Sequence, residues 1–160
     1  MIILATGFKI EDSICGFDIF GKNDINLREY FDTNPMAYNG ITVPNFPNFF
    51  ILLGPNTVLA HSTVIFMIEC QVNYIMNCLK QMFEFNINSI EVKYEQALNF
   101  RNEMDEQSLT RNFTSRNCTG WYKNKDGINF ILWPSNLFHY WWITHKANLL
   151  QDYWLTFENK

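Results

Sequence analysis

A run of five apolar residues that leads into a long helical pattern is the strongest constraint on the fold of this 160-residue chain. The run, Phe49 to Leu53, does not alternate with polar residues, which is typical of a strand buried on both faces. It ends at the turn residues Gly54, Pro55 and Asn56, and a helical pattern follows from Ser62 to Phe83. Strand, glycine turn and helix in this order predict one βα unit of an α/β fold.

A second buried strand is predicted at the start of the chain, where Ile2 to Leu4 precede the small residues Ala5, Thr6 and Gly7. Parallel strands need neighbours on both sides and cover on both faces, and two strands alone cannot supply them. We therefore expect an incomplete sheet. We also expect this chain to be the C-terminal part of a larger protein, with the missing strands in the preceding sequence.

The predicted helix carries one apolar stripe, because apolar residues recur along it at spacings of three and four. The stripe consists of Ile65, Ile68, Val72, Ile75, Leu79 and Met82. We expect this stripe to face the core. Glu69, Gln71 and Asn73 interrupt the apolar run, and a membrane-spanning helix needs about 20 apolar residues, so no transmembrane segment is predicted.

Further along the chain, the pattern predicts a strand, a second helix and a hairpin. Apolar and charged residues alternate over residues 90–94, and a helical pattern extends from Glu95 to Leu109. Residues 124–127 have the composition of a hairpin turn between two apolar segments. The hairpin and the aromatic-rich tail from Trp133 to Trp154 complete the chain.

The chain lacks a linker rich in proline, glycine or serine, so we expect one unit over residues 1–160. Within it, residues 1–85 form the predicted βα part, and residues 86–160 form the helical and hairpin tail. The predicted fold class is α/β, with an incomplete sheet, a long helix and an aromatic-rich C-terminal hairpin and tail.

Charge and cysteine content exclude two classes of function. The net charge is −4 and the isoelectric point is about 5.3, whereas a nucleic-acid binder needs an excess of lysine and arginine. Cys15, Cys70, Cys78 and Cys118 contain no CxxC pair, which argues against zinc. We expect free, buried thiols in a reducing compartment, and hence a cytoplasmic location.

The best candidate site is the segment from Gly54 to Ser62, which includes Pro55, Asn56, Thr57 and His61. In open α/β folds, ligands bind where strands end and helices begin, because free backbone N–H groups there favour negative charge. The alternative interpretation is structural: Gly54-Pro55 is a tight turn, and Ser62 or Thr63 is a helix N-cap.

Other patterns favour structural interpretations. The seven glycines form neither a GxGxxG nor a Walker motif. His139 and His145 are six residues apart, so they do not share a helix face, and no metal site is predicted. The tail aromatics could stack on bases or sugars, but few cations accompany them, and packing in the core or at a domain contact is favoured.

Several segments together resemble the class B flavoprotein monooxygenases, which include the Baeyer–Villiger and flavin-containing monooxygenases. The order and spacing of these segments agree with that family over almost the whole chain. They are Leu4–Phe8 (an ATG[FY] turn), Tyr38–Phe50, Gly54–Ser62 with Met67–Ile75, Cys118–Tyr122, and Leu132–Pro134.

The resemblance implies the C-terminal part of a discontinuous, Rossmann-like FAD domain in an enzyme that uses FAD, NADPH and O2. Such enzymes oxygenate ketones or small molecules that contain nitrogen or sulfur. It implies cofactor contacts at Ala5, Thr6 and Gly7, and at Gly54, Pro55, Asn56, Thr57, His61 and Ser62. It assigns no catalytic residue, because the glycine fingerprints and the active-site arginine of the family have no counterpart here.

Two rival hypotheses remain. The chain could be a non-catalytic fragment that packs on a partner, such as the missing N-terminal part, and binds no cofactor. It could also be a small aromatic-rich module that binds another ligand. Under the family hypothesis, we expect the isolated chain to hold FAD weakly and to be inactive.

Overall fold

The computed structural model describes residues 1–4, 17–59, 63–109, 122–123 and 127–157. Its elements, in chain order, are a 3-10 helix η2 (Lys22–Asp24), α1 (Leu27–Thr33), α2 (Val64–Glu84), β1 (Ile87–Val92), α3 (Tyr94–Leu109), α4 (Leu137–Thr144), α5 (Leu149–Asp152) and β2 (Tyr153–Phe157). Ala5 to Gly7, His61, Ser62, Cys15, Cys118 and most of the predicted hairpin turn lie outside the described residues.

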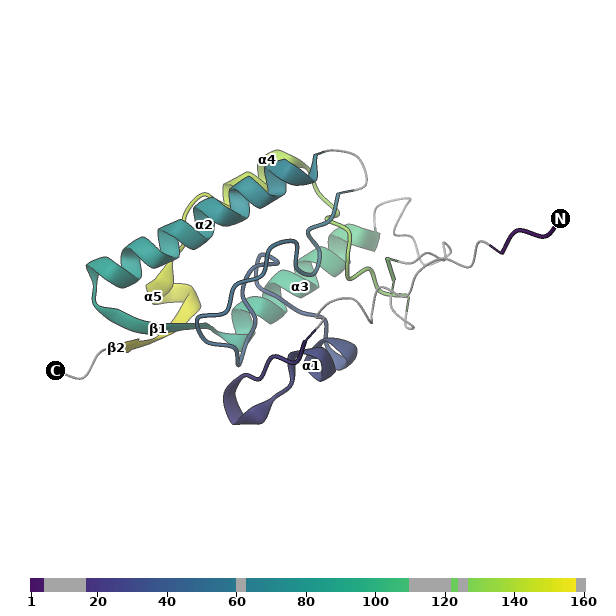
Figure 1. Cartoon of the computed structure of the whole chain (residues 1–160). Coiled ribbons are helices and arrows are strands. Elements are labelled where there is room, and N and C mark those ends of the chain that lie inside the picture. Colours follow the sequence, from purple (N-terminus) through teal and green to yellow (C-terminus); the bar gives the residue numbers. More distant parts are fainter. Residues whose placement is uncertain (5–16, 60–62, 110–121, 124–126, 158–160) are drawn as a thin grey trace.

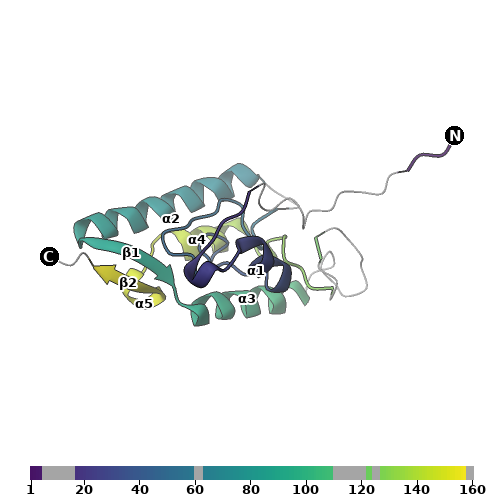
Figure 2. The same ribbon diagram turned by 60° about the horizontal axis from the view of Figure 1, so that its bottom comes forward.

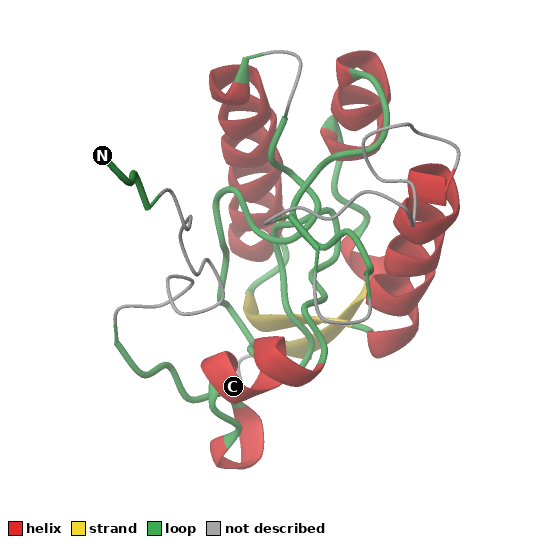
Figure 3. Ribbon diagram, turned by 90° about the vertical axis from the view of Figure 1, so that its right-hand side faces the viewer, coloured by secondary structure: helices red, strands yellow, loops and turns green. Residues whose placement is uncertain are grey.

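The described fold is a mixture of helices and one small sheet. β1 and β2 pair antiparallel, with Ile90 opposite Leu155 and Val92 opposite Tyr153. The helices α2 and α3 lie on opposite sides of a central region of loops, and the two-stranded sheet lies at one end of this region (Figures 1 and 2). Viewed from the side, loop backbone fills the space between the helices (Figure 3).

The helices and the first strand agree with the sequence analysis. The long helix, predicted over 62–83, is α2, and the helix predicted over 95–109 is α3. Ala97, Phe100 and Met104 of α3 are buried. The alternating segment is β1, although it ends at Val92 and Tyr94 already belongs to α3.

The two predicted buried strands are not strands in this structure, and that prediction was wrong. Ile2 to Leu4 are exposed, and they pair with no strand in the described part of the chain. In the second run, Phe50 makes an isolated antiparallel bridge to Thr42, and Ile51 N–H donates to Ile41 O at 2.8 Å. Leu53 then takes a positive φ of 57°, which ends the extended backbone. A strand needs a ladder of partners, and the described residues give this run one bridge.

The direction of the apolar stripe of α2 was also predicted incorrectly. The buried side chains are those of Met67, Cys70, Gln71, Tyr74 and Cys78. Ile65, Val72 and Leu79 from the predicted stripe are exposed instead. The helix therefore has apolar residues on its outward side as well as against the core.

The aromatic tail divides between core and surface. Trp133, Tyr140 and Tyr153 are buried, whereas Trp141, Trp142 and Trp154 are exposed. At the predicted hairpin, Lys123 and Asn129 form an isolated antiparallel bridge. β2 was not predicted from the sequence, because its partner β1 lies about 60 residues earlier in the chain.

No described helix combines the length and the apolar character that crossing a bilayer requires. The described helices include α2, with 21 residues. Polar and charged residues along α2, among them Glu69 and Lys80, account for this.

The two described cysteines should be almost unreactive in the folded chain. Cys78 is fully buried, and burial raises the pKa of its thiol to about 12, while burial also raises the pKa of Cys70. Because the thiolate is the reacting species, reaction of Cys78 at pH 8 should be about 1000-fold slower than in the unfolded chain.

An aromatic disulfide reagent measures this rate directly in a variant with Cys15 and Cys118 replaced by serine. The same variant in denaturant is the control. Rapid reaction of both thiols without denaturant would contradict the buried placement.

Candidate functional site

The turn at Gly54–Thr57 is held in place by the segment around Asn129. Asn56 is buried and has a positive φ of 59°, a conformation that asparagine tolerates better than most residues. Its backbone N–H donates to Phe130 O at 2.9 Å, and its side-chain Nδ2 donates to Asn129 O at 3.1 Å. Both donors thus fix the turn against a segment more than 70 residues away.

Close packing of backbone shapes the same turn from the other side. Thr57 is fully buried, and its Oγ1 donates to Gly54 O at 2.6 Å. A Cβ at Gly54 would lie 2.5 Å from Gly40 O, and a Cβ at Gly40 would lie 2.0 Å from Thr57 Cγ2. Only glycine at these two positions allows the approach, so the turn is built by contact between residues 40 and 54–57.

After the turn, residue 58 pairs with the tail. Val58 N–H donates to Ile131 O at 3.0 Å, and Trp133 N–H donates to Val58 O at 2.8 Å, in a parallel bridge. The tail segment is itself organised by buried Asn129, whose Oδ1 accepts from Leu132 N–H at 2.8 Å and whose Nδ2 donates to Leu132 O at 2.7 Å.

Asn129, which shapes the site, was not predicted from the sequence. The only local signal is its position before an apolar run, where asparagine often closes a turn with its own backbone. That signal does not reveal that Asn129 O also accepts from Asn56.

A second buried side chain joins the loop to two helices. Gln71 of α2 accepts from Leu53 N–H through Oε1 at 2.9 Å, and its Nε2 donates to Tyr140 OH of α4 at 2.9 Å. The Tyr140 hydroxyl donates to Asn39 O at 2.8 Å, and burial raises the pKa of this tyrosine. The residue just before Gly54 is therefore tied to the N-terminal half of α2.

The first turn of α2 begins soon after this segment. Thr63 is the N-cap residue, but its side chain accepts no capping hydrogen bond, and the first turn contains no acidic residue. Backbone N–H groups at a helix start carry a partial positive charge. Gly54, Pro55, Asn56 and Thr57 have no ionisable side chain, so the described part of the segment can orient a group but cannot transfer a proton.

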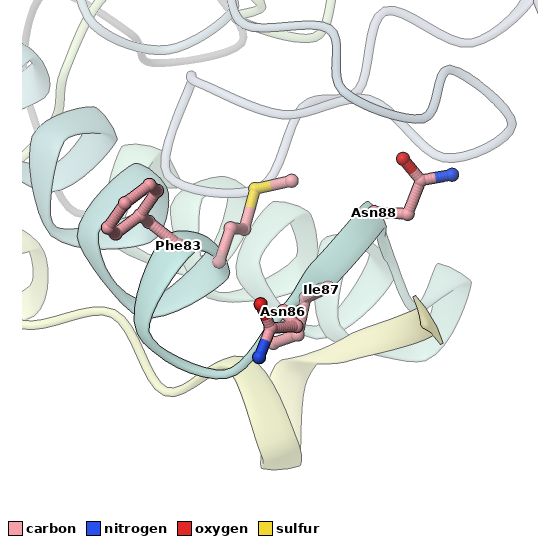
Figure 4. Close-up of a pocket in the computed structure, with 5 residues that line it drawn as sticks. Phe83, Asn86, Ile87 and Asn88 are labelled. Atoms are coloured by element: carbon pink, nitrogen blue, oxygen red, sulfur yellow. The ribbon is translucent and has the colours of Figure 1, made fainter. Parts of the chain in front are cut away.

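Two pockets lie at the opposite end of α2. One, of about 420 Å³, is lined by Met82, Phe83, Asn86, Ile87 and Asn88 (Figure 4). The other, of about 690 Å³, includes Phe85, Leu149 and Leu155. The turn is anchored at Gln71 through Leu53, and Gln81 at the larger pocket lies ten residues further along α2, which is about 15 Å of helix. The structure thus does not bring the pockets and the predicted site residues together.

No family model matches the chain. Individual proteins do match. A Baeyer–Villiger monooxygenase of Pseudomonas aeruginosa is 38% identical over 135 residues, which are 83% of this chain and 25% of the relative. The FAD-binding monooxygenase ktnD of Aspergillus niger is 31% identical over 144 residues, 88% of this chain and 24% of the relative. The chain spans about a quarter of the length of these relatives.

Solved structures have the same fold over this quarter. A steroid monooxygenase bound to NADP matches with a TM-score of 0.73 at 18% identity, over 88% of this chain and 27% of that one. Cyclohexanone monooxygenase from Rhodococcus sp. Phi1, bound to NADP+, matches with a TM-score of 0.67 at 20% identity, over 89% of this chain and 27% of that one.

Proposed function

We propose that this chain completes the FAD domain of a flavin-dependent monooxygenase, as its C-terminal quarter. The chain belongs to the Baeyer–Villiger and FAD-binding monooxygenases, and it spans about a quarter of their length. The whole enzyme would use NADPH and O2 to oxygenate ketones or small molecules that contain nitrogen or sulfur. Bound FAD would supply the redox chemistry. The observation that carries the proposal is the 38% identity over 135 residues.

Within that domain, we assign residues 1–85 to the cofactor side and residues 86–160 to the tail that supports it. The hydrogen bonds from Asn56 to residues 129 and 130 support this division, because they make the tail a brace for the turn. The side chains of Asn56 and Thr57 donate hydrogen bonds within the chain, so we assign them the role of positioning the backbone that leads to α2.

The described residues fit one part of FAD better than another. The uncapped start of α2, without an acidic residue in its first turn, suits the electron-rich edge of a flavin ring. Ala5, Thr6, Gly7, His61 and Ser62 join this contact by resemblance. The chain has no GxGxxG loop for the diphosphate, so a full-length protein must provide that loop elsewhere.

A chimaera tests the proposal. The Pseudomonas aeruginosa relative, with its matched quarter replaced by this chain, should purify yellow with bound FAD and should consume NADPH with ketones or thioethers. A colourless chimaera would instead support the rival function, a fragment that packs on a partner without a cofactor. The isolated chain should hold little FAD in either case, because it lacks the diphosphate loop.

The charge at the start of α2 should set the flavin potential in that chimaera. Thr63→Asp places a carboxylate at the N-cap, and a negative charge near a flavin opposes the uptake of electrons. A helix-end charge contributes about 0.3–1 kcal/mol, so the midpoint potential should fall by about 6–20 mV, at about 30 mV per 1.4 kcal/mol for two electrons.

Thr63→Asn is the matched control, since asparagine caps a helix as well as aspartate does but adds no charge. Dye-equilibration titration measures both potentials. Equal potentials for the two variants would remove the start of α2 from the flavin site.

A further inference from the structure

α2 exposes a row of apolar side chains on its outward side. The stripe consists of Ile65, Val72, Met76, Leu79 and Phe83, which are 67, 42, 58, 44 and 88% exposed. Their spacings of seven, four, three and four keep them in one row on a helix. The row runs over 19 residues, from Ile65 to Phe83, and its 18 steps of 1.5 Å give a length of about 27 Å.

This outward stripe lies opposite the side of α2 that faces the core. Residues follow one another by about 100° around a helix, which places Met67, Tyr74 and Cys78 about half a turn away from the stripe. Those three side chains are fully or almost fully buried. The exposed polar residues Glu69 and Lys80 lie on one flank of the stripe and not within it.

A helix that is apolar on two opposite sides is normally covered on both. Exposed contiguous apolar surface on a soluble protein marks a contact site. In this structure α2 lies at the edge of the molecule, and no described element covers its outward side (Figures 1 and 2).

We propose that the outward stripe of α2 packs against the polypeptide that makes up the other three quarters of a full-length monooxygenase. This inference rests on the proposed function. Solved monooxygenases share this fold over 27% of their length with a TM-score of 0.73, so in a protein of that size most of the chain is available to cover the helix. The fragment itself presents the stripe without a charge in it, as a core contact requires.

A second copy of this chain is a poorer occupant. Stable dimers bury about 800 Å² per partner with 20–30 residues a side, whereas the stripe offers five side chains on one helix. Contact within one covalent chain has no such requirement, because it does not lose the translational and rotational freedom of two molecules. A narrow row on one helix is therefore suited to packing within a chain.

The chimaera with the Pseudomonas aeruginosa relative tests this contact by thermal stability. Met76→Glu should lower its melting temperature by about 3–5 °C, because it buries a charge in an apolar contact and the chimaera is about four times as long as the matched segment. Asn73→Glu, at an exposed position outside the stripe, is the matched control and should change it by less than 2 °C. In the isolated chain the two variants should melt alike, and Met76→Glu should reduce aggregation.

If the chimaera does not fold, co-purification of two separate chains tests the same contact. The chain, co-expressed with the relative that lacks its matched quarter, should co-purify with it. Met76→Glu should reduce recovery at least tenfold, and Asn73→Glu should leave it unchanged.

Equal effects of Met76→Glu and Asn73→Glu in the chimaera and in co-purification would overturn the proposal. So would a stoichiometric dimer of the isolated chain that Met76→Glu dissociates while the chimaera is unaffected, since a second copy would then be the occupant. A stable but colourless chimaera that is sensitive to Met76→Glu would support the contact and reject the flavin function.

Discussion

Replacing Gly40 by alanine should lower the free energy of unfolding by about 3 kcal/mol. The new Cβ would lie 2.0 Å from Thr57 Cγ2 and 2.9 Å from Pro55 O, so the turn at residues 54–57 must move. Overpacking of this kind costs about 1–3 kcal/mol, and the positive φ of 67° adds about 1 kcal/mol for a residue with a Cβ. The melting temperature should fall by about 6–12 °C.

Gly127→Ala is the matched control for this substitution. Gly127 also has a positive φ, of 75°, but a Cβ there would meet no atom within 4 Å. Gly127→Ala should therefore lower the free energy of unfolding by only about 1 kcal/mol, which is the effect of a Cβ at a positive φ. Thermal unfolding followed by circular dichroism compares the two. Equal losses would show that residue 40 does not pack against Thr57 as closely as the structure indicates.

This result bears on the site, because Gly40 sets the position of the turn before α2. In the chimaera, Gly40→Ala should also lower the FAD content, whereas Gly127→Ala should retain it. Loss of FAD in both variants would point to general destabilisation and not to the shape of this turn.

Replacing Gln71 by leucine should have an effect of similar size, about 3 kcal/mol. The side chain is fully buried and makes one hydrogen bond to Leu53 N–H and one to Tyr140 OH. Leucine has a comparable volume but leaves the half-buried Leu53 N–H without its acceptor, at a cost of about 1–3 kcal/mol. It also removes one of the two hydrogen bonds of the buried Tyr140 hydroxyl, which still donates to Asn39 O.

Gln151→Leu is the control for the same chemical change at an exposed position, where Gln151 Oε1 accepts only from the neighbouring Asn148. It should change the stability by less than about 0.5 kcal/mol. Urea unfolding of the two variants gives the difference. A Gln71→Leu variant as stable as the parent would mean that water or another donor replaces both bonds.

The role of Gln71 shows why the inward side of α2 could not be predicted. A glutamine in a helical pattern is normally assigned to the surface, yet here it is buried because it connects a loop N–H to a tyrosine on α4. The predicted stripe contained Ile65 and Val72, which are exposed. Periodicity finds a helix but does not say which of two apolar sides meets the core.

The two predicted strands were wrong because a local pattern does not show which residues supply their hydrogen-bonded neighbours. Apolar residues without alternation indicate burial, and half-buried Phe49 and Phe50 do contact the core. Strand structure also requires hydrogen-bonded neighbours, which are supplied from elsewhere in the chain. The described residues supply one bridge, so the run is a loop.

The amino-acid pattern alone was enough to find the long helix, β1, α3 and the relationship to flavoprotein monooxygenases, because helix periodicity, alternation and motif order are local properties of the chain. The packed fold was needed to show which side of α2 is buried, that β2 pairs with β1, and that Asn129 holds Asn56 in its turn. These features join residues that are far apart in sequence, and the free energy of such contacts depends on the whole packed arrangement and not on any local pattern.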